Sequence, residues 1–94
     1  MARALPRDYN LYMFYFYIVR CKDDTLYCGS TNNTDKRMQR HNAGRGSKYV
    51  RSRGGGEIVY TENFRKLANA MRREVQVKKW PRKEKESLIK GRKT

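Results

Sequence analysis

One stretch of this sequence is both apolar and uninterrupted, and it restricts the possible folds more than any other feature. Residues 11–19, LYMFYFYIV, combine aromatic and β-branched side chains that favour a strand. The run is shorter than the about 20 residues needed to cross a bilayer, and it lacks the small-residue cleavage site of a signal peptide. The turn sequence KDDT and a second strand-like stretch, LYCG, follow it. The sequence therefore predicts a β-hairpin with strands at 13–21 and 26–29.

Apolar spacing, capping residues and β-branched runs divide the rest of the chain into one more strand and four helices. The strand is expected at 57–64, and the helices at 35–42, within 44–56, at 65–80 and from 82 to about 90. Pro81 separates the last two helices, because proline interrupts a helix but suits the first turn of the next. We predict an α+β fold, a small three-stranded antiparallel sheet flanked by helices in the order β-β-α-α-β-α-α.

The composition restricts the partners. The chain has 23 Lys and Arg against 9 Asp and Glu, a formal net charge of +14. A charge of this size repels itself, and a polyanion is its natural compensation. Nucleic acid is the first candidate, because neutralised phosphates release their counterions. An anionic membrane surface and a solvated surface without a partner are the alternatives.

The length of 94 residues suffices for one domain with a small core. We expect residues 1–11 to form a loose basic tail and residues 12–94 to form the single domain. Cys21 and Cys28 are too few for a dense disulfide framework, and nothing in the sequence is typical of a secreted protein. We therefore expect a reduced, cytoplasmic protein whose cysteines are small core residues.

Glu74 is the unusual residue of the long helix. Four apolar residues of this helix repeat at helical spacing: Leu67, Ala70, Met71 and Val75. Glu74 follows the first three by seven, four and three residues, so the same periodicity turns it toward the sheet. An ionised carboxylate facing a core costs several kcal/mol unless a cation meets it. Two interpretations remain open: a salt bridge with Arg37, or a ligand for one divalent cation such as Mg²⁺.

Two other pairs of residues have a plain and a functional interpretation. Arg37 and His41 are four residues apart and share a helix face, which is either a solvated basic face or part of a site. Tyr17 and Tyr27 either pack as strand aromatics or contribute their hydroxyl groups to chemistry.

Together these residues resemble the GIY-YIG endonuclease family in order and spacing, over about residues 14–90. YFY at 15–17 corresponds to the first motif, with Tyr15 in the place of its glycine, and YCG at 27–29 to the second. The family's last-helix asparagine falls near Glu86 or Ser87. The site residues that the resemblance implies are Tyr17, Tyr27, Arg37, His41 and Glu74.

The resemblance implies hydrolysis of a phosphodiester bond assisted by one Mg²⁺ or Mn²⁺ ion bound at Glu74. Tyr17 would help to activate the attacking water, and Arg37 would hold the phosphate. Tyr27 and His41 would position water or phosphate. The expected activity is that of a DNA endonuclease on single-stranded, branched or duplex DNA, with no protein partner implied. A basic nucleic-acid-binding module that does not cut is the alternative, and a structural protein of an RNA–protein assembly is a third class.

Outside the catalytic set, basic residues are expected to contact mainly the phosphate backbone. The predicted nucleic-acid contacts are Arg45, Lys48, Arg51, Arg53, Arg72, Arg73, Lys78 and Lys79.

The hairpin carries a geometric prediction, because Tyr17 and Tyr27 act on one phosphate only if both rings leave the same face of the sheet. A two-residue turn at 23–24 would pair residue 20 with residue 27 and separate the rings. A three-residue loop at 23–25 pairs residue 21 with residue 27 and aligns both rings with Val19. We therefore predict a loop of odd length, or a bulge.

Overall fold

The computed structural model describes residues 13–32 and 48–94. The expected tail at 1–11 and the expected helix at 35–42 lie outside the described residues. The described elements are β1 (Phe14–Cys21), β2 (Leu26–Thr31), α2 (Lys48–Ser52), β3 (Gly56–Phe64), α3 (Leu67–Lys78) and α4 (Arg82–Ile89). No helix of residues 13–32 and 48–94 is long and apolar enough to span a membrane.

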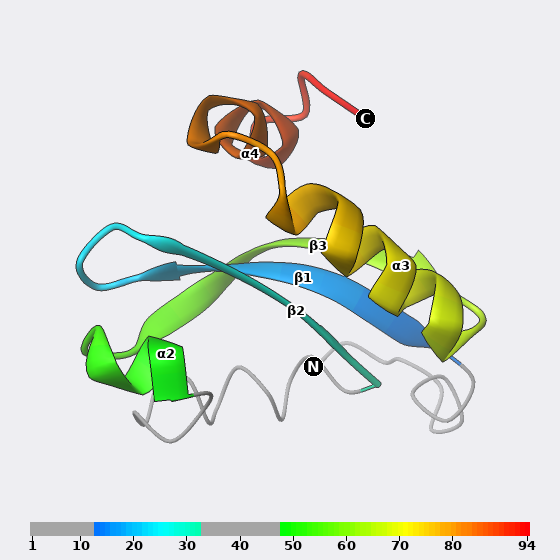
Figure 1. The fold of residues 1–94 in the computed structure, drawn as a ribbon, viewed down its shortest axis with the longest axis horizontal. Coiled ribbons are helices and arrows are strands. Elements are labelled where there is room, and N and C mark those ends of the chain that lie inside the picture. The colour runs from blue at the N-terminus through cyan, green and yellow to red at the C-terminus, as the bar shows by residue number, and fades with distance from the viewer. Residues whose placement is uncertain (1–12, 33–47) are drawn as a thin grey trace, which may run out of the picture.

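The three strands form one antiparallel sheet in the order β2-β1-β3 (Figure 1). β1 is the middle strand of the sheet, and its apolar side chains are covered on both faces. Side chains alternate along the strand, so Phe16 and Ile18 pack with Val77 and Leu88 from α3 and α4. Tyr17 on the other face belongs to a cluster completed by α2. This second cluster consists of Tyr17, Val19, Cys21 and Val50. The predicted α+β class and three-stranded antiparallel sheet are confirmed.

The hairpin loop has the predicted odd length but begins one residue early. Cys21 donates its backbone N–H to the carbonyl of Thr25 at 2.8 Å, so the loop consists of residues 22–24. Asp24 takes a positive φ of 72°, which aspartate tolerates better than most residues. The Asp23 carboxylate accepts hydrogen bonds from the backbone N–H and the hydroxyl of Thr25, which returns the chain to the strand. The predicted loop parity is confirmed, and the predicted position at 23–25 is wrong by one residue.

The face that α3 turns to the sheet differs from the predicted apolar stripe. Ala70 and Val77 are buried, whereas three of the predicted stripe residues are about half exposed. Those three are Leu67 at 44%, Met71 at 51% and Val75 at 54%. The side of α3 that packs on the sheet contains the small side chain of Ala70 and that of Val77. The predicted helical spacing was therefore right, but the side of the helix predicted to face the sheet was wrong. Glu74 nevertheless lies on the inner side, four residues after Ala70 and three before Val77.

Candidate active site at the edge of the sheet

Tyr17 and Tyr27 share one face of the sheet. Tyr17 on β1 is paired with Gly29 on β2, and Tyr27 is paired with Val19. The two tyrosine ring centroids are 6.5 Å apart. Tyr17 is only 2% exposed, and Tyr27 is half-buried. The predicted same-face arrangement of these rings is confirmed.

Gly29 is required by the position of the Tyr17 ring. A Cβ atom on residue 29 would lie 2.5 Å from the Tyr17 hydroxyl oxygen and 2.6 Å from its Cζ. The ring of Tyr17 therefore crosses the backbone of β2, which is an edge strand. A glycine in a strand interior commonly marks such a close approach, and here it brings the Tyr17 hydroxyl to the edge of the sheet.

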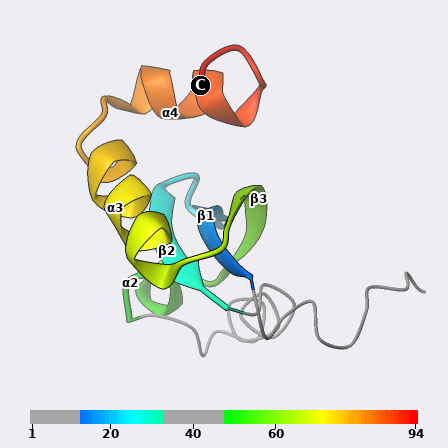
Figure 2. The same ribbon diagram turned by 90° about the vertical axis from the view of Figure 1, so that its right-hand side faces the viewer.

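Glu74 reaches the same edge strand from the opposite face. The hydroxyl of Ser30 donates a hydrogen bond to Glu74 Oε1, and Lys78 Nζ lies 3.1 Å from Glu74 Oε2. Ser30 directly follows Gly29, and consecutive strand residues point to opposite faces. Tyr17 and Glu74 thus approach neighbouring residues of β2 from the two sides of the sheet. Figure 2 shows α3 alongside β2.

Ser30 was missed by the sequence analysis, although one signal was present. Strand alternation groups it with Leu26 and Cys28 on the face that α3 covers. Strand alternation could not identify Glu74 as the hydrogen-bond partner of Ser30, because the two residues are 44 positions apart in the chain.

The surroundings of Glu74 fit a hard divalent cation. Residues 13–32 and 48–94 contain no group of three or more His, Cys, Asp or Glu side chains that would enclose a metal. Mg²⁺ keeps several waters and is usually held by one or two carboxylates together with substrate phosphates. The Glu74 side chain is 22% exposed, and its Oε2 is contacted by a lysine that is itself 57% exposed. One oriented carboxylate with an accessible oxygen is therefore compatible with such an ion.

Two other inward carboxylates differ from Glu74 because arginines hold both of their oxygens. Arg20 donates to Glu86 at 2.8 and 2.9 Å, and Arg73 donates to Glu62 at 2.9 Å on each oxygen. The hydrogen bonds from Arg20 lower the pKa of Glu86 to about 2. Glu86, which stands near the place of the family's last-helix asparagine, is thus engaged in a structural ion pair.

Several of the remaining predicted site residues lie outside the residues that the structure describes. Arg37, His41 and Arg45 are not among the described residues, and for Lys48 only the backbone in α2 is described. Arg51 is exposed on α2, and Arg53 pairs with Asp23 at 3.5 Å.

The four basic residues predicted on or beside α3 have different surroundings. Lys79 is exposed, and so is Arg72, which donates to the side chain of Asn69 at 2.7 Å. Lys78 contacts Glu74. Arg73 points the other way, is 13% exposed, and lies 5.3 Å from the centroid of the Trp80 ring. The charge of Arg73 is therefore already compensated within the fold.

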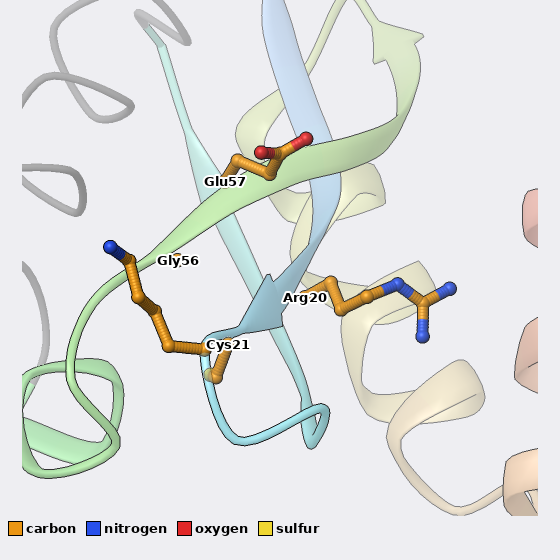
Figure 3. Close-up of a pocket in the computed structure, with 5 residues that line it drawn as sticks. Arg20, Cys21, Gly56 and Glu57 are labelled. Carbon is orange, nitrogen blue, oxygen red and sulfur yellow. The ribbon is translucent and has the colours of Figure 1, made fainter.

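A hollow of about 530 Å³ lies elsewhere, at the β1–β3 pair (Figure 3). Its lining residues are Arg20, Cys21, Lys22, Gly56 and Glu57. None of these is a predicted site residue, and the Arg20 side chain leaves the hollow toward the helices. The hollow is therefore separate from the edge site.

The fold and the edge site define a class, the GIY-YIG nuclease-type domain. A family model described as the GIY-YIG catalytic domain matches residues 13–87, so the chain belongs to this family. Membership points to a nuclease, a hydrolase that binds nucleic acid, and GIY-YIG nucleases generally depend on a divalent metal.

Within the family, the chain is similar to small UPF0213 proteins. It is 47% identical over 75 residues to the UPF0213 protein of Oceanobacillus iheyensis, covering 80% of this chain and 87% of that one. It is 48% identical over 77 residues to the UPF0213 protein of Clostridium perfringens, covering 82% and 83%. The solution NMR structure of a Bacillus halodurans UPF0213 protein matches with a TM-score of 0.53 at 41% identity, covering 83% of each chain. These relatives are therefore themselves little more than this domain.

Proposed function

We propose that this protein is a metal-dependent DNA endonuclease formed by a single domain at residues 12–94, and that it works in the reducing cytoplasm. The observation that carries the proposal is that Tyr17 and Glu74 lie against neighbouring residues of the edge strand β2, Gly29 and Ser30, from opposite faces of the sheet. Both cysteines are free thiols, as expected in a reducing compartment. Single-stranded or branched DNA is the substrate we favour.

The chemistry is assigned to the chain's own residues as follows. Glu74 would hold Mg²⁺ or Mn²⁺, which when bound supplies positive charge for the phosphate and the leaving oxygen. Ser30 orients the carboxylate by donating to Oε1. Tyr17 helps to activate the attacking water, either by taking its proton at a phenolate oxygen or by a hydrogen bond. The phenolate form requires nearby positive charge, because an ordinary phenol has a pKa of about 10. Arg37 holds the phosphate, and Tyr27 and His41 position water or phosphate.

A non-catalytic nucleic-acid-binding module is the second candidate, and the exposed cations favour it as much as they favour the nuclease. Three exposed basic residues suit phosphate contacts: Arg72 on α3, Lys79 directly after α3, and Arg51 on α2. If four to six phosphates are neutralised, affinity should fall with salt at a log–log slope of roughly −3 to −5. Salt-dependent binding is expected of both candidates, so cleavage must separate them.

The deciding experiment compares wild type, Glu74→Ala and Glu57→Gln on labelled single-stranded, branched and duplex DNA with Mg²⁺, Mn²⁺ or chelator. Glu57 is an exposed carboxylate outside the site and controls for the loss of one negative charge. Glu74→Ala should reduce cleavage by at least roughly a thousandfold, about 4 kcal/mol of transition-state stabilisation, while binding stays intact or improves. A wild type that binds DNA but cuts none of these substrates with either metal would establish the binding module instead.

A further inference from the structure

The two carboxylate oxygens of Glu74 have partners of different kinds. Oε1 accepts from Ser30, a short side chain fixed on a sheet strand. Oε2 is 3.1 Å from Lys78, which is one helical turn further along α3 and mostly exposed. The first contact is anchored by the backbone of β2, whereas the second depends on a long and flexible side chain.

The contact with Lys78 is the easier one to replace. Exposed ion pairs four residues apart on a helix are weak, because solvent screens the charges and the lysine loses rotamer freedom. Arginine would hold the carboxylate differently, since its planar guanidinium donates to both oxygens at once. This is how Arg73 and Arg20 hold Glu62 and Glu86.

We propose that Lys78 is an exchangeable counter-ion of Glu74. It neutralises the carboxylate in the metal-free protein, yields Oε2 when a divalent cation binds, and then contacts a phosphate of the nucleic acid. Ser30 is the positioning residue that keeps Oε1 in place throughout. The inference rests on the proposed function in one respect, that metal and nucleic acid meet at Glu74.

Electrostatics supports this exchange. An ammonium group and a divalent cation repel each other at a shared oxygen, so Lys78 must leave when the metal arrives. Lysine has a flexible stem and behaves as a point charge, which lets it turn to a phosphate nearby. Metal and nucleic acid should therefore each strengthen the binding of the other.

A second lysine acts on the same part of the sheet. Burial raises the pKa of the Cys28 thiol, and the charges of Lys85 and Lys78 oppose that effect. Val77 of α3 and Leu88 of α4 pack in one cluster with Cys28, which precedes Ser30 by two residues, so the helices that carry these lysines lie beside this part of β2. Lys85 is half-buried and has no ion pair within residues 13–32 and 48–94. A phosphate beside Glu74 would thus meet positive charge from both α3 and α4.

The test is Mn²⁺ binding measured by calorimetry without nucleic acid, so that it does not depend on cleavage. Lys78→Gln should tighten Mn²⁺ binding about two- to fivefold, because the competing ammonium is gone. Lys83→Gln, which removes an exposed lysine of α4, controls for net charge and should change affinity by less than about 1.5-fold. Ser30→Ala should weaken binding about tenfold, and Ser30→Thr, which keeps the hydroxyl, should restore it.

A second measurement tests whether Lys78 contacts a phosphate of the nucleic acid once the metal has displaced it from Glu74. The affinity of wild type for a single-stranded oligonucleotide should rise when chelator is replaced by Ca²⁺. Lys78→Gln should show a smaller rise, the part that comes from the metal itself, and Lys83→Gln should keep the full rise. Equal Mn²⁺ affinities for the two lysine variants, or a full Ca²⁺ effect in Lys78→Gln, would overturn the exchange. A wild type that follows all these expectations yet cuts no DNA would refute the proposed endonuclease and leave the exchange standing.

Discussion

Two regions of the molecule contain a carboxylate that faces inward. One is the junction between the hairpin and α4, and the other is the edge of the sheet at β2. The two carboxylates have different partners. At the junction, Glu86 receives two hydrogen bonds from Arg20 and one from Arg82 at 2.9 Å. Arg82 also reaches Asp24 at 3.1 Å, so the loop of the hairpin is tied to α4. At the edge, Glu74 has a serine and one exposed lysine. A carboxylate saturated by guanidinium groups stabilises a fold, whereas one with a replaceable partner is available for chemistry.

The same contrast separates Arg73 from the other basic residues predicted to bind nucleic acid. Arg73 contacts both oxygens of Glu62 and lies over the Trp80 ring, which Lys93 approaches to 4.8 Å. It also donates to the backbone oxygen of Thr94 at 3.1 Å. Arg73 thus ties the C-terminal end to β3 and α3. The net charge of a chain therefore overstates the number of cations that are free for phosphate.

The largest difference between the two regions should appear in stability. Glu86→Gln leaves Arg20 and Arg82 to share only the exposed carboxylate of Asp24 and should cost about 1.5–3 kcal/mol. For a domain of this size, that lowers the melting temperature by roughly 6–24 °C. Glu74→Gln should stay within about 0.5 kcal/mol of wild type, because the glutamine oxygen can still accept from Ser30 and only the weak ion pair with Lys78 is lost. Thermal melting followed by circular dichroism measures both, and equal losses would remove the distinction between the regions.

A somewhat smaller loss is expected at the edge itself, from Gly29→Ala. The new Cβ would collide with the Tyr17 ring, and overpacking of this kind costs about 1–3 kcal/mol. The matched test is a double-mutant cycle, in which Gly29→Ala is repeated in a Tyr17→Ala background. There the methyl group has space and should cost little. An undiminished cost in that background would mean that Gly29 serves the backbone rather than Tyr17.

Low pH should remove the stabilisation that ionised Glu86 gives to the junction between the hairpin and α4. The pKa of Glu86 falls from its ordinary value of 4.5 to about 2 in the folded protein. The unfolded chain therefore binds the proton first, and the stabilisation is complete above about pH 4.5 and is lost as the pH falls through about 2. The difference in melting temperature between wild type and Glu86→Gln should shrink across this window. A difference that persists unchanged at pH 2 would mean that packing, not the carboxylate charge, holds α4.

Local patterns predicted much of this fold, because they depend on neighbours in the chain. The alternation and β-branching of 57–64 located β3 to within one residue of its observed start at Gly56. Hairpin parity placed Tyr17 and Tyr27 together, while the loop moved by one residue because Asp23 binds Thr25. The ion pairs were not predictable in this way. Arg20 and Glu86 are 66 residues apart, and only the packed fold selects such partners.

The smallest expected effect concerns the phase of α3, which decides where Glu74 points. Met71→Ala should change stability by less than about 0.5 kcal/mol, because Met71 is half exposed and alanine favours helices. Val77→Ala, on the same helix but buried, should cost about 2 kcal/mol for its lost methyl groups and the cavity left behind. If the two costs were reversed, Met71 would face the sheet and the helix would be rotated from its described position. Glu74 is three residues after Met71 and three before Val77, so it would stay on the inner side of the helix but shift relative to Ser30. Urea titration of the two alanine variants measures both free energies of unfolding. The variants are comparable because each removes apolar atoms from the same helix, one from its exposed side and the other from its buried side.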